Sequence, residues 1–127
     1  DRSQLPLFLK TMFRREIEQL RSNPVLKRLY RWELSSENEM IVKIREQRER
    51  TGLKLIEKVS SLTGFPEKEI AVMASILTAS ITYLVMLEEF CPVYNGIALD
   101  GDSGWEQINE GIETLIDKIF ADDRKKH

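Results

Sequence analysis

The sequence predicts an all-α fold of five helices. Apolar residues recur along the chain at the three- and four-residue spacing of helices, and capping residues mark where several helices begin. With 6 glycines and 4 prolines, the chain is poor in the residues that a β-rich architecture needs. Its 127 residues, 42% hydrophobic, correspond to one domain with a core of ordinary size.

The first helix is predicted over about residues 5–21, with Pro6 in the opening turn, where proline is tolerated. A break at Ser22 precedes Asn23-Pro24, which is a good N-cap followed by proline at the first helical position. A short second helix should therefore run to about residue 34. The residues expected to point inward from it are Val25, Leu26, Leu29 and Trp32.

The third helix is predicted to start at a capping box formed by Ser36 and Glu39. It should continue to about Thr63, with Gly64 as the residue that ends it. A fourth helix then starts near Pro66-Glu67 and is ended by Cys91-Pro92. These signals place two long helices one after the other.

The fourth helix is unusual because residues 70–87 carry no charge. The length of this run is only at the lower limit for a membrane-spanning helix, and serine and threonine residues interrupt its apolar side chains. No excess of Lys or Arg on either flank would orient such a helix in a membrane. A helix buried on nearly all sides fits better. A domain of this size can rarely wrap one helix completely, so a partner subunit is the simplest cover.

A loop is predicted over residues 93–102, and Ser103 with Glu106 forms a second capping box. The fifth helix should end near Phe120, before a polar, frayed tail at 122–127. Its apolar stripe consists of Trp105, Ile108, Ile112, Leu115, Ile116 and Ile119. Gly111 borders the stripe at a cost of about 1 kcal/mol relative to alanine, which indicates a close helix crossing.

The sequence offers no catalytic or metal-binding set, so we expect no enzyme activity, metal or cofactor. One histidine, His127, ends the chain, and the one cysteine, Cys91, is typical of a structural thiol in a reducing compartment. The segment 100–104 resembles the start of a calcium loop, but its twelfth position is Gly111 rather than glutamate. The basic first half and acidic second half indicate solvated helix faces rather than a nucleic-acid surface.

Arg48 projects into the apolar face of the third helix, and Glu16 falls within the apolar arc of the first. An unpaired charge in such a place costs several kcal/mol. Arg48 is therefore expected to pair with Glu16 first or Glu33 second. Two alternatives are that it meets an anionic group of a ligand, or that it extends to solvent at the domain edge.

Three segments carry a resemblance to a known family: Trp32-Glu33-Leu34, Tyr83-Leu84-Val85, and Asn95-Gly96-Ile97 followed by Trp105. In their order, along essentially the whole chain, they resemble the C-terminal regulatory domain of bacterial transcriptional regulators of the TetR (tetracycline-repressor) family. The resemblance implies an effector-binding and dimerisation domain over residues 1–121, in a cytoplasmic homodimer that binds a small-molecule effector.

The resemblance also implies an N-terminal helix-turn-helix domain that reads DNA. Because the sequence starts at Asp1 without methionine, we expect it to be a piece of a longer protein that lacks this domain. The last two long helices, at 70–90 and 105–120, would pair with those of a second subunit as a four-helix bundle. Candidate interface residues are Ala71, Ser75, Thr78, Thr82, Ile108, Gly111 and Leu115.

A ligand pocket would lie among the preceding helices and the fourth. Methionine adapts to ligands of varied shape, and Trp and Tyr combine an apolar body with one polar tip. The candidate ligand-binding residues are Phe8, Met12, Trp32, Met40, Arg48 and Tyr83. Tyr83 is the best of the aromatic candidates, because its hydroxyl needs a partner within an apolar helix. The competing interpretation is that all of these residues belong to the core.

The expected mechanism is sensing: a bound small molecule favours one spacing of the two subunits, and so moves the DNA-reading domains in or out of register. The main alternative is a small, dimeric all-α interaction module without a ligand, which would have a filled interior.

Overall fold

The computed structural model describes residues 4–126, with side chains through residue 121, and confirms the all-α fold. The helices are α1 (Leu5–Arg21), α2 (Pro24–Ser35), α3 (Glu39–Thr63), α4 (Glu67–Leu87) and α5 (Asp102–Lys126). Two short strands, β1 (Val93–Tyr94) and β2 (Ile97–Ala98), pair antiparallel between α4 and α5.

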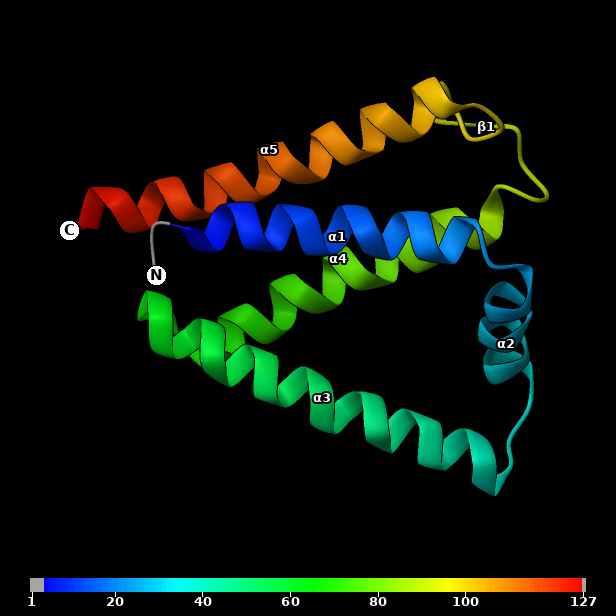
Figure 1. Cartoon of the computed structure of the whole chain (residues 1–127), viewed down its shortest axis with the longest axis horizontal. Coiled ribbons are helices and arrows are strands. Elements are labelled where there is room, and N and C mark those ends of the chain that lie inside the picture. Colours follow the sequence, from blue (N-terminus) through cyan, green and yellow to red (C-terminus); the bar gives the residue numbers. More distant parts are fainter. Residues whose placement is uncertain (1–3, 127) are drawn as a thin grey trace.

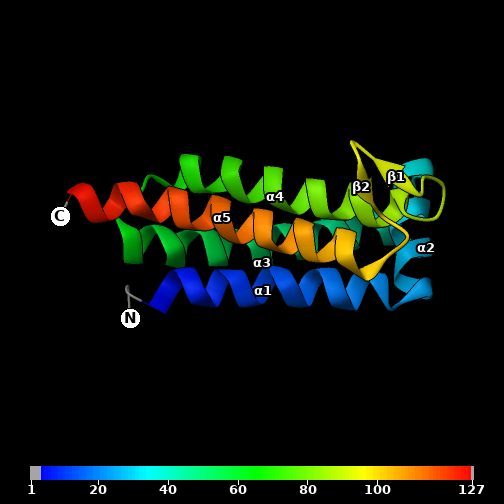
Figure 2. The same ribbon diagram turned by 90° about the horizontal axis from the view of Figure 1, so that it is seen from above.

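The helices form a wedge that is narrow at one end and wide at the other, where α2 stands across it (Figure 1). α1 and α5 lie side by side, while α3 diverges from α1 toward the end where α2 stands across the bundle. From above, the four long helices run along one common direction (Figure 2). α4 is the element against which α3 packs most extensively.

The main core lies where α1, α4 and α5 meet, with the C-terminal part of α3 added through Val59. The apolar stripe predicted for the fifth helix supplies much of it. Among the side chains buried there are Phe13, Ile17, Ile81, Val85, Trp105 and Ile116. The N-terminal part of α3 lies outside this core, which leaves space between α3 and α1.

Two of the predicted helix boundaries are confirmed in atomic detail. The Asn23 side chain accepts a hydrogen bond from the Leu26 N–H at 3.0 Å and caps α2. Gly64 ends α3 with φ +80°, a left-handed conformation that glycine adopts without a steric penalty. The first helix also has the predicted bounds.

The predicted start of the third helix is wrong by two residues. Asn38, not Ser36, is the N-cap of α3, and its Oδ1 accepts from the Ile41 N–H at 3.1 Å. Serine and asparagine cap equally well, and Ser36 is instead extended (φ −138°, ψ 152°), which lets the chain turn away from α2. The fourth helix is also shorter than expected, since α4 ends at Leu87.

The capping box predicted for the fifth helix does not form. α5 begins at Asp102, and the Glu106 carboxylate accepts a hydrogen bond from Arg14 of α1 at 3.0 Å instead. The helix also continues past the predicted end at Phe120 to Lys126. The side chains of 122–126 and the whole of residue 127, part of the predicted tail, lie outside the described residues.

A β-hairpin occupies part of the loop predicted at 93–102. Its turn residues, Asn95 and Gly96, have φ values of 52° and 79°. Asn-Gly is the preferred dipeptide for a type I′ hairpin turn, so this signal was present in the sequence. The hairpin is anchored to α5, because the Trp105 Nε1 donates to the Leu99 carbonyl at 2.9 Å.

The predicted inward face of the second helix is wrong in part: Leu26 packs against the core and Leu29 is partly buried, but Val25 and Trp32 are not. Val25 is 66% exposed and Trp32 is 38% exposed, whereas Lys27 and Glu33 are buried. The reason is that α2 lies across the end of the bundle, where polar side chains join it to its neighbours. The Lys27 ammonium lies 3.6 Å from the Glu88 carboxylate of α4, and Glu33 pairs with α3.

The fourth helix is not buried on all sides within a single chain, as expected for a domain of this size. Only three of its residues, Ile70, Ile81 and Val85, are buried. Val72 and Ile76 are 59% and 63% exposed. By length and composition α4 is apolar enough to cross a membrane. The chain alone therefore leaves a largely apolar helix face uncovered.

Candidate ligand cavity

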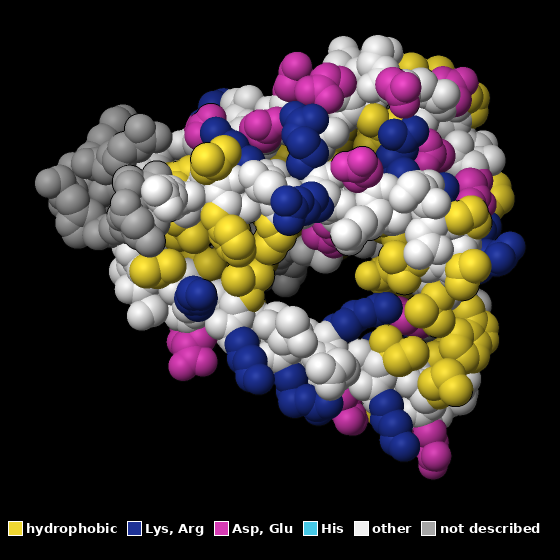
Figure 3. All heavy atoms as spheres, in the orientation of Figure 1, with side chains coloured by type: hydrophobic (Ala, Val, Ile, Leu, Met, Phe, Trp, Pro, Cys, Tyr) yellow, Lys and Arg dark blue, Asp and Glu magenta, His cyan; other side chains and the backbone are white. Residues whose placement is uncertain are grey.

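A cavity of about 720 Å³ lies between α1, α3 and α4, with the end of α5 at its closed side. Figure 3 shows it as an opening in the face of the molecule between α1 and α3, with a Lys or Arg side chain reaching along its edge. The volume falls within the range of roughly 300–1,000 Å³ of small-molecule sites.

Part of the α4 wall of the cavity consists of small side chains. Ala71, Ala74, Ser75 and Thr78 follow each other at helical spacing along this wall. They cannot fill the space that opens as α3 diverges from α1. Larger apolar residues close the rest of the lining, among them Met12, Phe13, Ile56, Phe65, Leu77 and Ile119.

The charged side chains of the lining all come from α3. They are Arg45, Arg48 and Glu49. The Arg48 Nη1 lies 2.5 Å from the Glu33 Oε2, and its guanidinium stacks 4.5 Å from the centre of the Tyr30 ring. Arg45 donates a hydrogen bond to the backbone carbonyl of Glu33. Both arginines thus tie α3 to α2 at the wide end of the cavity.

Glu33 is the buried partner in this group of charges. Its side chain is 6% exposed, against 38% for Arg48. Its Oε1 is buried without a hydrogen-bond partner. Of the two predicted partners of Arg48, the structure shows the second, Glu33; no ion pair joins Arg48 to Glu16 among the described residues.

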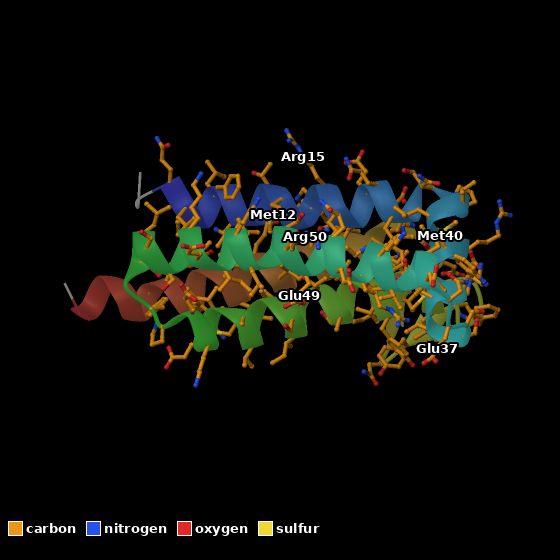
Figure 4. The ribbon with its side chains drawn as sticks, turned by 90° about the horizontal axis from the view of Figure 1, so that it is seen from below. Met12, Arg15, Glu37, Met40, Glu49 and Arg50 are labelled. Atoms are coloured by element: carbon orange, nitrogen blue, oxygen red, sulfur yellow. The ribbon has the colours of Figure 1, made fainter. Side chains whose placement is uncertain are left out.

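Two of the predicted ligand-binding residues, Met12 and Arg48, line the cavity. Figure 4 shows Met12 on the side of α1 that faces α3. Met40 lies at the start of α3, outside the cavity. Phe8 borders a separate, smaller cavity of about 260 Å³ near the start of α1. Trp32 and Met40 are both exposed away from either space.

The environment predicted for Tyr83 is wrong. Its side chain is 53% exposed rather than enclosed, and it packs edge-on against Tyr94 with the ring centres 6.3 Å apart. The hydroxyl makes no hydrogen bond within the part of the chain that the structure describes. The residue lies outside the cavity because it shares the outer face of α4 with Val72 and Ile76.

The structure places the predicted interface residues in three kinds of location: the cavity lining, the core and the surface. Ala71, Ser75 and Thr78 line the cavity, and Thr82 is partly buried one turn further on. Ile108 belongs to the core of its own chain. Leu115, 50% exposed, and Gly111 lie on the surface of α5. Apart from its chain neighbours and the adjacent backbone of its own helix, no atom lies within 4 Å of a Cβ built on Gly111, so the predicted close crossing does not occur within this chain.

Arg45 and Glu49 were missing from the predicted lining. Arg45 precedes Arg48 by three residues, a spacing that places both on one helix face. That relation was visible in the sequence. The position of the α4 wall was harder to foresee, because small residues at helical spacing predict a close helix contact and a cavity wall equally well.

Glu16 lies one turn beyond Met12 on the same face of α1 and is partly buried. Its carboxylate has no ion pair or hydrogen bond among the described residues, and burial raises its pKa above the ordinary value. The folded state therefore binds a proton more readily than the unfolded state. The free energy of unfolding must fall as pH rises from about 4.3, the ordinary glutamate pKa, through the raised pKa.

We expect Glu16→Gln to raise the free energy of unfolding at pH 7.5, because the neutral amide avoids the cost of burying a charge. The gain should shrink as the pH is lowered to 4 and below, where the wild-type carboxyl is protonated. Urea unfolding at several pH values measures both effects. Glu18→Gln, on the exposed side of the same helix, is the control. A loss of stability in Glu16→Gln at pH 7.5 would contradict this account.

Comparison of the chain with protein-family models, with curated proteins and with solved structures finds no match. The function must therefore be argued from the cavity and from the surfaces around it.

Proposed function

We propose that this chain is the effector-sensing and dimerisation domain of a bacterial transcriptional regulator similar to the TetR family. The cavity carries this proposal. It is large enough for a small molecule, mostly apolar, and bounded on one side by α3, whose N-terminal part lies outside the main core. An interaction module without a ligand would have no need of such a space.

The contacts of α1 support a route from the cavity to the start of the chain. The middle of α1 lines the cavity through Leu9 and Met12. Its first turns pack near the end of α3, where Leu5 and Phe8 share the smaller cavity with Leu62. A ligand that displaces α3 would therefore shift the beginning of α1. In a longer protein, a DNA-binding domain joined there would move with it.

Binding of the neutral, environment-sensitive dye Nile red tests whether the cavity admits apolar molecules. We expect saturable fluorescence enhancement from the wild-type protein, and at least a tenfold weaker affinity in Ala74→Trp, whose side chain fills the cavity. Val25→Trp, on the exposed face of α2, controls for nonspecific dye binding. Equal enhancement by both variants would show that the dye binds elsewhere and would count against the sensing role.

An exposed apolar stripe supports a dimer. Val72, Ile76 and Tyr83 recur at helical spacing on the outer face of α4, and each is more than half exposed. On α5, Leu115 and Gly111 lie one turn apart on the surface. Exposed apolar residues that share one helix face in this way are typical of an interaction site. A second copy of the chain would cover the exposed face of α4. It would also bring the α5 surface at Gly111 and Leu115 into contact with the partner.

We expect the wild-type protein to sediment as a dimer and Ile76→Glu to weaken the dimer by about 100-fold, since a charge would be buried without a partner. Gly111→Leu should have the same effect, because its side chain has open space in one chain and would meet only a partner. Val25→Glu, on exposed α2, is the control. A monomeric wild type, or a dimer unaffected by both variants, would oppose the proposal.

The composition of α4 favours one alternative, a membrane-spanning segment. Against it, Ile70, Ile81 and Val85 of α4 are buried in the core with α1 and α5, and these contacts would have to break for the helix to enter lipid. Flotation with phosphatidylcholine vesicles distinguishes the two roles. We expect the protein to stay in the aqueous fraction; flotation with the vesicles would support the membrane role.

A further inference from the structure

The cavity has one polar end, and it lies on α3. Arg45, Arg48 and Glu49 supply its charged groups. Elsewhere the polar lining side chains are the hydroxyl residues Ser75 and Thr78, and the Ser75 hydroxyl already donates to the Ala71 carbonyl at 2.6 Å. A ligand in the cavity therefore meets an apolar surface along most of its length and guanidinium groups at one place.

Most hydrogen-bond donors of the two arginines are unused. Each guanidinium carries five N–H groups in a planar fork. Arg48 donates from Nη1 to the Glu33 carboxylate, and Arg45 donates from Nη2 to the Glu33 backbone carbonyl. Within the described residues, their other nitrogens make no hydrogen bond. The two arginines therefore keep N–H donors that a ligand in the cavity could use.

Positive groups outnumber negative ones in the lining at this end, where the guanidinium groups of Arg45 and Arg48 accompany one carboxylate, that of Glu49. Two guanidinium groups lie near one buried carboxylate, that of Glu33, and Arg45 has no ion pair among the described residues. Glu49 is exposed and pairs with neither arginine. A carboxylate on the ligand would accept two parallel hydrogen bonds from a guanidinium, which is the geometry that arginine recognises best.

A ligand with a cationic head is the opposite possibility. Its partners would have to be Glu49, Glu16, which has no ion pair among the described residues, and the unpaired Oε1 of Glu33. Of these three carboxylates only that of Glu49 lines the cavity, whereas both arginines do. Burial also raises the pKa of Glu16, which favours its neutral form. The placement of the groups therefore favours an anionic head.

We propose that the effector is an amphipathic carboxylate, whose apolar body fills the space between α1, α3 and α4 and whose carboxylate binds Arg45 and Arg48. This inference depends on the proposed sensing function, because it names the class of molecule sensed. It assigns the two arginines as specificity-determining residues of the cavity, in addition to their contacts with α2.

Three probes with the same chain and different heads test the inference: decanoate, 1-decanol and decylamine. Displacement of Nile red at pH 7.5 gives their affinities for the wild-type protein. We expect decanoate to bind about tenfold more tightly than 1-decanol, which lacks charge-assisted hydrogen bonds, and decylamine to bind most weakly. Raising the salt concentration should reduce the preference for decanoate only modestly, since the site is partly enclosed.

A triple variant, Glu33→Gln with Arg45→Gln and Arg48→Gln, removes the arginine charges without leaving the Glu33 carboxylate unpaired. We expect it to bind 1-decanol as the wild type does and to lose the preference for decanoate. If the variant does not fold, Arg45→Gln alone should reduce the preference, because the Arg48–Glu33 pair stays intact.

The other outcomes overturn the inference in distinguishable ways. Equal affinity for all three probes in the wild type would leave an apolar sensing cavity and remove the role of the arginines. Tightest binding of decylamine would reverse the charge of the head group. Nile red binding that none of the probes displaces would reject the amphipathic carboxylate alone, whereas the absence of Nile red binding would reject the sensing function as well.

Discussion

Replacing Arg48 with methionine is expected to lower the free energy of unfolding by about 3 kcal/mol, because removing one partner of a buried ion pair leaves the other charge uncompensated. The Glu33 side chain is 6% exposed and one of its oxygens already lacks a partner. Without Arg48 its carboxylate would have no ion-pair partner among the described residues. The stacking of the guanidinium on the Tyr30 ring would be lost as well.

A double-mutant cycle separates the loss of the pair from the loss of packing. Glu33→Gln combined with Arg48→Met removes both charges, and we expect it to recover most of the stability lost in Arg48→Met alone. Urea unfolding followed by circular dichroism measures each free energy. If Arg48→Met unfolds within about 0.5 kcal/mol of the wild type, the pair behaves as an ordinary surface salt bridge and does not hold α3 to α2.

Gly104→Ala is expected to lower the free energy of unfolding by about 2–3 kcal/mol, because the added methyl group has no space. Its Cβ would lie 1.8 Å from the Ala98 carbonyl oxygen and 2.6 Å from the Ala98 carbonyl carbon. Both are backbone atoms of β2, so the hairpin would have to move off α5. That movement would also disturb the hydrogen bond between Trp105 and Leu99.

Gly52→Ala is the matched control for this substitution. Gly52 lies within α3, and apart from its chain neighbours and the adjacent helix backbone no atom lies within 4 Å of a Cβ built there. We expect this variant to be more stable than the wild type by about 0.5–1 kcal/mol, the ordinary preference for alanine over glycine inside a helix. Thermal unfolding of both variants provides the comparison. A Gly104→Ala protein as stable as the wild type would mean that the hairpin is not held against α5 as described.

Local signals in the sequence predicted the helices well, because caps and breakers act within a few residues. Asn23 and Gly64 ended up at the boundaries expected from their conformational preferences. Errors arose where two good caps compete, as at Ser36 and Asn38. They also arose where a capping residue has a better partner far away in the sequence, as Glu106 has in Arg14.

The candidate site was predictable only in part, because it depends on how the helices are placed. The apolar surroundings of Arg48 indicated a partly buried charge that needs a partner, and α2 supplies that partner through Glu33. The sequence did not show that α2 lies across the end of the bundle with Trp32 outside, since its apolar pattern suggested the opposite face. Tyr83 was misplaced for a related reason: an uncharged helix has no polar side from which its orientation can be read.

The attachment of α3 has a consequence for selectivity. α3 is tied to α2 through Arg45 and Arg48 near one end, and it joins the core through Val59 near the other. Between these points it borders the cavity, so it can tilt or bow while the packing of α1 and α5 stays intact. We therefore expect molecules of different girth to be tolerated at modest energetic cost, and discrimination among them to come from chemistry at the anchored end rather than from shape.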